Sequence, residues 1–233
     1  MKVKKGIWDK LLHYLNKISP NLRRQLISFT YLAKHYGQYN SIKKNESVDS
    51  KDNPLPWLTY PSIEYLSNLD LSKETVFELG SGYSTLWFAG RSKKVYSVEA
   101  DYTWYEKIFK EVSSFDNVEL NLVDDNHGLE IYEGIEKSDL ILIDGLDREK
   151  AIDFIIENID ISKIKCLVVD NSDWESILKK IQEFVEFSQW VDFEFVGFGP
   201  INRYVWSTHV LINPKNKIKR RDKTISPINN LYL

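Results

Sequence analysis

Hydrophobic positions follow two different periods along this chain of 233 residues. From residue 75 onwards, short continuous apolar runs alternate with stretches that have a helical period. The apolar runs are typical of buried strands, and the stretches with a helical period are typical of amphipathic helices. Strands are expected at 75–79, 95–98, 118–123, 140–143, 166–169, 192–197 and 208–212. Helices are expected at 62–69, 84–91, 103–113, 148–158 and 174–187, with a short helix or turn near 128–135.

The order of these elements predicts an α/β fold. Strands that alternate with helices form a parallel sheet covered by helices on both faces. The last two strands have no helix between them, so we expect an antiparallel hairpin there. A dinucleotide-binding dehydrogenase would instead continue with a second βαβ half. The prediction is a Rossmann-like, doubly wound, seven-stranded sheet, mostly parallel, with a C-terminal antiparallel hairpin and an N-terminal helical extension.

The N-terminal extension begins with an amphipathic pattern. Within residues 6–18 the apolar positions share one helical face, namely Ile7, Leu11, Leu12, Leu15 and Ile18. Pro20 is expected to end this helix, and Asn21 to cap a second helix that runs to about residue 36. Packing of the first helix against the domain is favoured. The alternative is peripheral contact with a membrane surface, which Trp8 and the lysines would suit.

A change in polarity marks the expected domain boundaries. Residues 37–54 are polar and lack a period, which predicts a loop or linker. We therefore expect a helical extension and linker at 1–53 and the main domain at 54–213. A basic C-terminal tail is expected at 214–233.

Charge and composition narrow the classes of protein. The net charge is +7 over residues 1–50, −15 over 51–214 and +5 over 215–233, which sum to −3. The basic ends are expected to lie near the acidic body, and the alternative is a surface for anionic lipid, polysaccharide or nucleic acid. One cysteine, Cys166, excludes an internal disulfide framework and is expected to be a buried strand thiol. No transmembrane segment or signal peptide is expected, so a cytoplasmic location is predicted.

The strongest functional signal follows the first predicted strand. Gly80 and Gly82 let the backbone pass close to a ligand, and the next helix presents free N–H groups there. Glu99 ends the second strand, where an acid can bind both hydroxyls of a ribose. Asp124 and Asp125 follow the third strand and can meet the edge of an adenine. These residues together predict a nucleoside site.

Two residues indicate that the predicted nucleoside site does not bind a pyrophosphate. Ser84 stands where the dinucleotide fingerprint has its third glycine. Glu78 lies beside the glycine turn, where its carboxylate would repel a phosphate but suit a ligand that carries a sulfonium and an ammonium.

The pattern resembles the class I S-adenosylmethionine-dependent methyltransferases over about residues 54–212. The matching positions are Glu78, Gly80, Gly82, Glu99, Asp124 and Asp144. The resemblance implies S-adenosylmethionine as the cofactor, with Glu78, Gly80 and Gly82 at its methionine end, Glu99 at the ribose, and Asp124 or Asp125 at the adenine. Ser81, Ser84 and Thr85 of the same turn are also expected to bind it.

A stiff segment with three prolines, residues 54–61, precedes the first strand. Trp57 and Tyr60 of this segment are predicted to bind the cofactor. The alternative is that the segment forms a hydrophobic plug at the end of the sheet. Arg203, in the glycine–proline link before the last strand, is expected with these aromatics at an acceptor wall, and a plain hairpin connection is equally compatible.

Polar residues after the fourth and fifth strands form a candidate reaction site. Asp144, Asp170 and Asn171 all stand at carboxyl ends of strands and can converge. Asp144 is the candidate catalytic residue. Three oxygen ligands with open positions suit Mg²⁺, and the trio resembles the metal ligands of cation-dependent O-methyltransferases. The alternative is that Asp144 and Asp170 contact the cofactor or cap helices.

The function expected from these features is S-adenosylmethionine-dependent O-methylation of a small molecule or glycan. One alternative is a nucleic-acid methyltransferase that uses the basic termini, which the acidic body of the domain disfavours. Another is a non-catalytic binding protein with the same fold. The methyl acceptor, the need for a metal and the oligomeric state are left open by the sequence.

Overall fold

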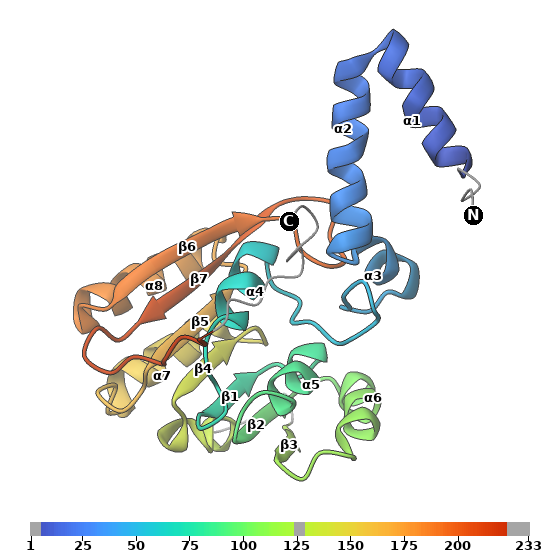
Figure 1. Cartoon of the computed structure of the whole chain (residues 1–233). Helices are drawn as coiled ribbons and strands as arrows, with labels where there is room; N and C mark the ends of the chain where they lie inside the picture. The colour runs from blue at the N-terminus through green and yellow to red at the C-terminus, as the bar shows by residue number, and fades with distance from the viewer. Residues whose placement is uncertain (1–5, 124–128, 223–233) are drawn as a thin grey trace.

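The structure, a computed structural model, describes residues 6–123 and 129–222. Within these ranges, seven strands form one sheet in the order β3-β2-β1-β4-β5-β7-β6 (Figure 1). The strands are β1 Thr75–Leu79, β2 Lys94–Glu99, β3 Val118–Leu122, β4 Leu140–Ile143, β5 Cys166–Asp170, β6 Val191–Gly197 and β7 Trp206–Ile212. Strands β1 to β5 run parallel, and β7 is antiparallel to both β5 and β6. The predicted Rossmann-like sheet and its terminal hairpin are confirmed.

Helices cover both faces of this sheet. They are α4 Tyr60–Ser67, α5 Tyr83–Ala89, α6 Tyr102–Val112, the 3-10 turns η2 Leu129–Tyr132 and η3 Ile135–Lys137, α7 Arg148–Asn158 and α8 Glu175–Ser188. The first of these begins at Tyr60, not at Ser62 as expected, because Pro61 is tolerated in the first turn of a helix.

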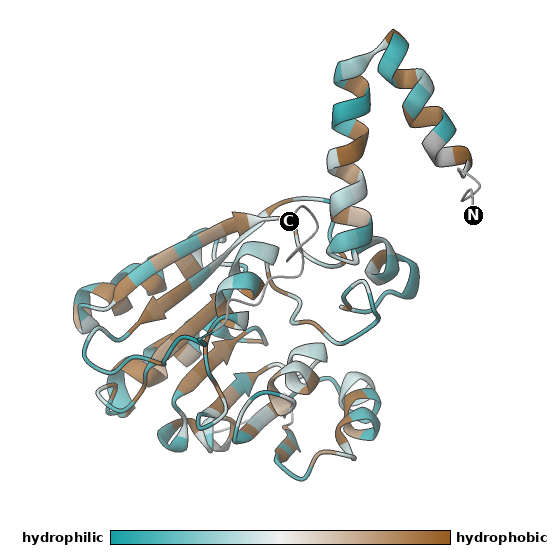
Figure 2. Cartoon of the chain, in the orientation of Figure 1, coloured by the Kyte–Doolittle hydropathy of each residue, from teal (hydrophilic) through white to brown (hydrophobic). Residues whose placement is uncertain are grey.

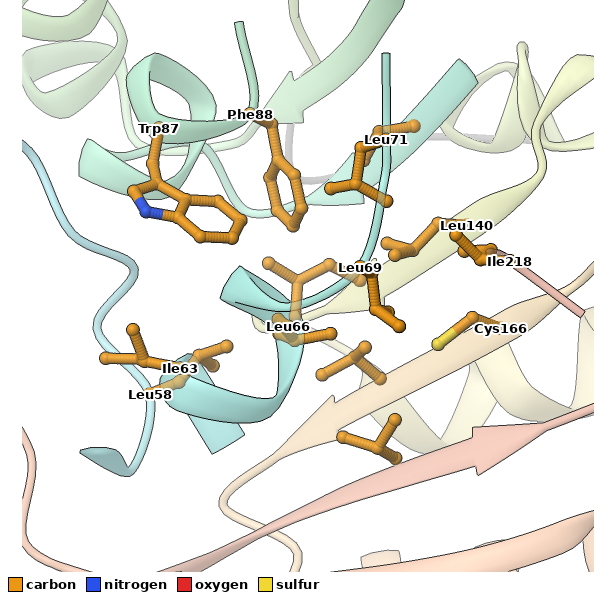
Figure 3. Close-up of a cluster of buried hydrophobic side chains, with 14 of the residues drawn as sticks. Leu58, Ile63, Leu66, Leu69, Leu71, Trp87, Phe88, Leu140, Cys166 and Ile218 are labelled. Carbon is orange, nitrogen blue, oxygen red and sulfur yellow. The ribbon is translucent and has the colours of Figure 1, made fainter. Parts of the chain in front are cut away.

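Residues along the central strands alternate between two cores. Leu140 and Leu142 face the core under α4 and α5, whereas Ile141 and Ile143 face the core under α7 and α8. Burial on both faces explains the continuous apolar runs in the sequence. Figure 3 shows the first core, in which Cys166 lies among leucines and Ile218. The predicted buried thiol is confirmed, and burial raises its pKa.

The register brings the carboxyl ends of four strands to one edge. Leu79 of β1 pairs with Val98 of β2 and with Ile143 of β4, and Ile143 pairs with Val169 of β5. The residues that follow these strands therefore start from the same level, which is where ligands bind in open α/β sheets.

The N-terminal helices differ from expectation. Helices α1 (Ile7–Ile18) and α2 (Pro20–Thr30) form a hairpin that projects from the domain, so the favoured packing of α1 against the domain is wrong (Figure 1). Pro20 starts α2 behind Ser19, and Asn21 lies inside the first turn instead of capping it. Proline suits that position because the first helical N–H groups have no partner within the helix. One π-helical turn, η1 Tyr31–His35, continues α2.

The expected linker at 37–54 is partly helical. Helix α3 spans Gln38–Lys44, and Gln38 Nε2 donates to the carbonyls of Gly199 and Asn202, at 3.0 and 3.1 Å. Val48 is buried against α5 and α6. The loop prediction is wrong for residues 38–44. This helix is held to the domain by polar side chains that bond to backbone groups, so it shows no hydrophobic period in the sequence. The boundary at residue 53 stays a prediction.

The start of the predicted tail packs against the domain. Lys219 and Arg221 exchange backbone hydrogen bonds with Asp70 and Asn68, at 2.7 and 2.8 Å. Among the helices of the described ranges, none has the length and apolarity that a membrane span requires.

Candidate functional site

A cavity of about 700 Å³ opens at the carboxyl edge of the sheet. Nine of the predicted site residues line it: Trp57, Gly80, Ser81, Gly82, Ser84, Glu99, Asp144, Asp170 and Asn171. Its size lies within the range of small-molecule sites. The sequence therefore placed most of the site, and the remaining predicted residues lie elsewhere.

Backbone contact between two glycines forms the floor of the cavity. Gly80 has a φ of +93°, and a Cβ on it would lie 2.7 Å from the Cα of Gly145. The Gly80 N–H donates to the carbonyl of Val98, and the Asp144 N–H donates to that of Leu79, each at 2.9 Å. Only glycine tolerates both the torsion and the approach. Gly145 was not predicted as a site residue, although it follows the fourth strand directly.

Helix α5 starts immediately after this turn. Its N-cap is Gly82, and the Thr85 hydroxyl accepts a hydrogen bond of 2.9 Å from the Gly82 N–H. Thr85 is fully buried and does not reach the cavity, whereas Ser84 lines it. The N–H groups of Gly82 and Thr85 are therefore satisfied within the turn, and Gly82, Tyr83 and Ser84 line the cavity.

Glu99 is held at the end of β2 by four donors. Its Oε2 accepts from the N–H and hydroxyl of Ser81, at 2.9 and 3.0 Å. Its Oε1 accepts from the N–H groups of Ala100 and Asp101, both at 2.9 Å. Glu99 therefore presents a fixed carboxylate to the cavity, as expected for an acid that binds a diol.

Trp104 supports the same wall and was missed by the sequence analysis. Asp101 caps α6 by accepting from the Trp104 N–H at 2.7 Å, and the Trp104 indole donates to the carbonyl of Ser81 at 2.7 Å. The aspartate three residues before Trp104 was the available signal, since this is the spacing of an N-cap.

Glu78 lies behind the glycine turn and not on the cavity wall. It is fully buried, and its Oε2 accepts from the hydroxyls of Thr85 and of Ser97, the latter at 2.9 Å. Its Oε1 has no hydrogen-bond partner among the described residues. Burial raises the pKa of Glu78 to about 7, against the opposing effect of the hydroxyl donors.

Three other predicted cofactor residues fall outside this geometry. Tyr60 is buried in the core with its ring 4.5 Å from that of Tyr36, so it does not line the cavity. It points inward because it opens α4, whereas Trp57, three residues earlier, lies half-exposed at the rim. Asp124 and Asp125 lie outside the described residues.

Two of the three expected metal ligands, Asp144 and Asn171, bind a cation of the protein itself. Arg148 Nη2 donates to the carbonyl and Oδ1 of Asp144, both at 3.0 Å, and to Oδ1 of Asn171 at 2.9 Å. Its guanidinium also lies 5.6 Å from the ring centroid of Trp174, a cation–π distance. Neither residue was predicted, although Arg148 stands one helical turn after Asp144.

Asp170, the third expected ligand, accepts its hydrogen bonds from other donors. The indole of Trp206 donates to both carboxylate oxygens, at 3.0 and 3.2 Å, and the Thr208 hydroxyl donates to Oδ1. Burial and the nearby Asp144 raise its pKa. Mg²⁺ needs several free oxygen ligands, and here they face N–H and O–H donors. These contacts give no support to the expected Mg²⁺ site, which stays a prediction, and no group of three or more His, Cys, Asp or Glu side chains in the described part of the chain could hold a metal ion.

The cavity lining has a negative charge excess. Its described acids are Glu46, Glu99, Asp101, Asp144 and Asp170, against the single base Arg148. Arg203 is not among the lining residues, but its neighbour Tyr204 is, together with Trp57 and Trp174 at the mouth. This balance disfavours an anionic ligand such as pyrophosphate.

Comparisons with known proteins identify the fold. No protein-family model and no curated protein matches the chain. Precorrin-6y C5,15-methyltransferase from Geobacter metallireducens matches with a TM-score of 0.51 and 13% identity, over 73% of this chain and 95% of that chain. M. capricolum TrmK, in complex with S-adenosyl-homocysteine, matches with a TM-score of 0.49 and 16% identity, over 70% of this chain and 71% of that chain. M. jannaschii TYW2, in complex with AdoMet, matches with a TM-score of 0.46 and 17% identity, over 71% of this chain and 79% of that chain.

The likeness to the precorrin-6y methyltransferase, with its TM-score of 0.51, supports a conclusion about the fold. The chain has the Rossmann-like fold of class I methyltransferases, as the strand order and the terminal hairpin independently indicate. The resemblance expected from the sequence is confirmed at the level of the fold.

The contact between Gly80 and Gly145 gives a direct test of the site. Gly80→Ala is expected to lower the free energy of unfolding by roughly 2 kcal/mol or more, because the new Cβ combines a positive φ with a backbone clash. Gly90→Ala is the matched control, since the nearest atoms to its Cβ lie 3.8 and 4.0 Å away. Urea unfolding of both variants measures the difference, and equal stabilities would contradict the assigned contact.

Arg148 gives a second test. Arg148→Met is expected to lower the free energy of unfolding by roughly 2–4 kcal/mol, because Asp144 and Asn171 lose their partner in a largely buried place. Lys150→Met, at a side chain 74% exposed, should change it by less than about 0.5 kcal/mol. The melting temperature of the wild-type protein should be unchanged by EDTA. Stabilisation of the wild type by added Mg²⁺ would contradict this account.

Proposed function

We propose that this protein is an S-adenosylmethionine-dependent methyltransferase. One observation carries the proposal: the glycine turn, the fixed carboxylate of Glu99 and the buried carboxyl of Glu78 surround one wall of an acidic cavity at the carboxyl edge of the sheet. A positively charged nucleoside suits this wall, whereas the phosphates of a dinucleotide would meet an excess of carboxylates.

The residues present fit the parts of that ligand. Glu99 would hold the ribose hydroxyls, and the backbone of Gly80 and Gly82 would pass beside the methionine part, where a side chain would interfere. The unpartnered Oε1 of Glu78 places a negative charge behind the turn, on the side of the sulfonium and ammonium. Asp124 and Asp125 stay the predicted contacts of the adenine.

The cofactor supplies an electrophilic methyl group bonded to a sulfonium. When an acceptor hydroxyl oxygen bonds to that methyl carbon, the S–C bond breaks and its electron pair stays on sulfur. Asp144, which lines the cavity, is the group we propose to accept the hydroxyl proton. Burial raises its pKa, while Arg148 opposes this effect and orients the carboxylate. In-line alignment supplies most of the remaining catalysis.

The mouth of the cavity favours an acceptor with a flat or sugar ring. Trp57, Trp174 and Tyr204 line it, and their side chains are 41%, 55% and 62% exposed. Exposed aromatic faces are costly unless they bind a partner, and they stack well on rings. We therefore propose O-methylation of a small molecule or glycan, to be tested by methyl-transfer screens on metabolites and sugars.

Calorimetry with S-adenosylhomocysteine tests the proposed cofactor. Saturable binding is expected, and Glu99→Gln should weaken it by roughly 10- to 100-fold, because a charged acceptor of the ribose is lost. Glu119→Gln on β3 removes the same charge from a side chain 51% exposed and should leave the affinity unchanged. Absence of binding, with NAD bound instead, would overturn the proposal.

The raised pKa of Glu78 predicts a pH dependence of that affinity. Below about pH 7 the carboxyl is protonated and neutral, and above it the carboxylate attracts the ligand's positive charge. Affinity should therefore rise roughly five- to tenfold between pH 6 and pH 8. Glu78→Gln should flatten this rise. A wild-type affinity that is constant across the same range would show that Glu78 does not sense the ligand.

A further inference from the structure

The hairpin of α1 and α2 has no role in the cavity and little contact with the domain. It projects from the body in Figure 1 and is joined to it through η1 and α3. Contact between the two helices buries Leu15, which is 9% exposed. The neighbouring surface of α1, about 70° around the helix from Leu15, is exposed.

That surface carries a stripe of large apolar side chains. Ile7, Leu11, Tyr14 and Ile18 are 88%, 40%, 61% and 60% exposed. Their spacings of four, three and four residues place them on one helical face. Brown hydrophobic segments are visible along both helices in Figure 2. On α2, Phe29 is also exposed, at 57%.

The same region is strongly basic. From residue 10 to residue 45 the sequence contains no Asp or Glu. Within the hairpin itself, residues 7–30, the basic residues are Lys10, Lys17, Arg23 and Arg24, against the single acid Asp9. At 100° per residue, Lys10 and Lys17 flank the apolar stripe on one side. The hairpin thus combines an exposed apolar face with an excess of positive charge.

We propose that the α1–α2 hairpin binds the surface of an anionic lipid bilayer. The apolar stripe would enter the boundary between headgroups and acyl chains, and the flanking lysines would meet anionic headgroups. Charge selects this occupant over a second copy of the chain, since a second copy would bring two basic segments together. The four aligned apolar side chains select it over nucleic acid, whose backbone offers them no partner.

The hairpin is connected to the cavity through the chain that follows it, so binding of the hairpin to a bilayer has a consequence for the cavity. Helix α3 follows η1 directly, and the residues after it, Asn45, Glu46 and Ser47, line the cavity. Gln38 of α3 also holds the link before β7 through Gly199 and Asn202. A bilayer bound by the hairpin would therefore be connected to the cavity rim through one short helix.

Co-sedimentation of the full chain with vesicles tests the proposal. Vesicles of phosphatidylcholine that contain phosphatidylglycerol should bind the wild type at least roughly tenfold more tightly than pure phosphatidylcholine, and less tightly in high salt. Ile7→Gln with Ile18→Gln should weaken binding roughly tenfold or more. Lys10→Gln with Lys17→Gln should also weaken it roughly tenfold or more. Far-UV circular dichroism confirms that each variant stays folded.

Two matched controls carry the same changes on the body of the domain. Phe187→Gln with Val196→Gln alters side chains that are 53% and 57% exposed, and Lys73→Gln with Lys179→Gln removes two exposed charges. Both should bind vesicles as the wild type does. Equal loss in the controls, or no vesicle binding, would overturn the proposal. So would a dimer dependent on Ile7 and Ile18, or oligonucleotide binding, in the absence of vesicle binding.

Discussion

The backbone contact between Gly80 and Gly145 is the constraint on which the site depends. Two loops from neighbouring parallel strands approach so closely that neither has room for a Cβ. Hydrogen bonds from Gly80 to Val98 and from Asp144 to Leu79 continue the sheet's pairing beyond the strands. Because the turn is fixed in this way, the start of α5, the carboxylate of Glu99 and the carboxylate of Asp144 face one cavity.

Charge within the cavity is arranged by internal pairs. Arg148 joins the loops after β4 and β5 through Asp144 and Asn171, and Trp206 and Thr208 satisfy Asp170 from β7. The antiparallel end of the sheet therefore contributes to the same cavity. An arginine in this place provides permanent positive charge, which a bound ion would provide only when present.

The N-terminal segment connects two regions with different chemistry. Its first helices expose apolar and basic side chains, whereas α3 and the residues after it bury Gln38, Ser41 and Val48 against the domain and reach the cavity rim. Polar burial by Gln38 and Ser41 makes this attachment, since both side chains donate to backbone carbonyls. Such a segment has no hydrophobic period, although it is part of the folded body.

Local patterns in the sequence determined the strands, most helices, and the glycine turn and Glu99 that line the cavity. Apolar runs define the buried parallel strands. Gly80, Gly82 and Glu99 stand at strand ends within one βαβ unit, so the backbone of that unit alone places them. Contacts between distant segments were decided only by the tertiary structure: Arg148 with Asn171, Trp206 with Asp170, and the burial of Tyr60. The physical reason is that periodicity records which face of an element is buried, whereas the partner of a buried charge is chosen by packing across the whole fold.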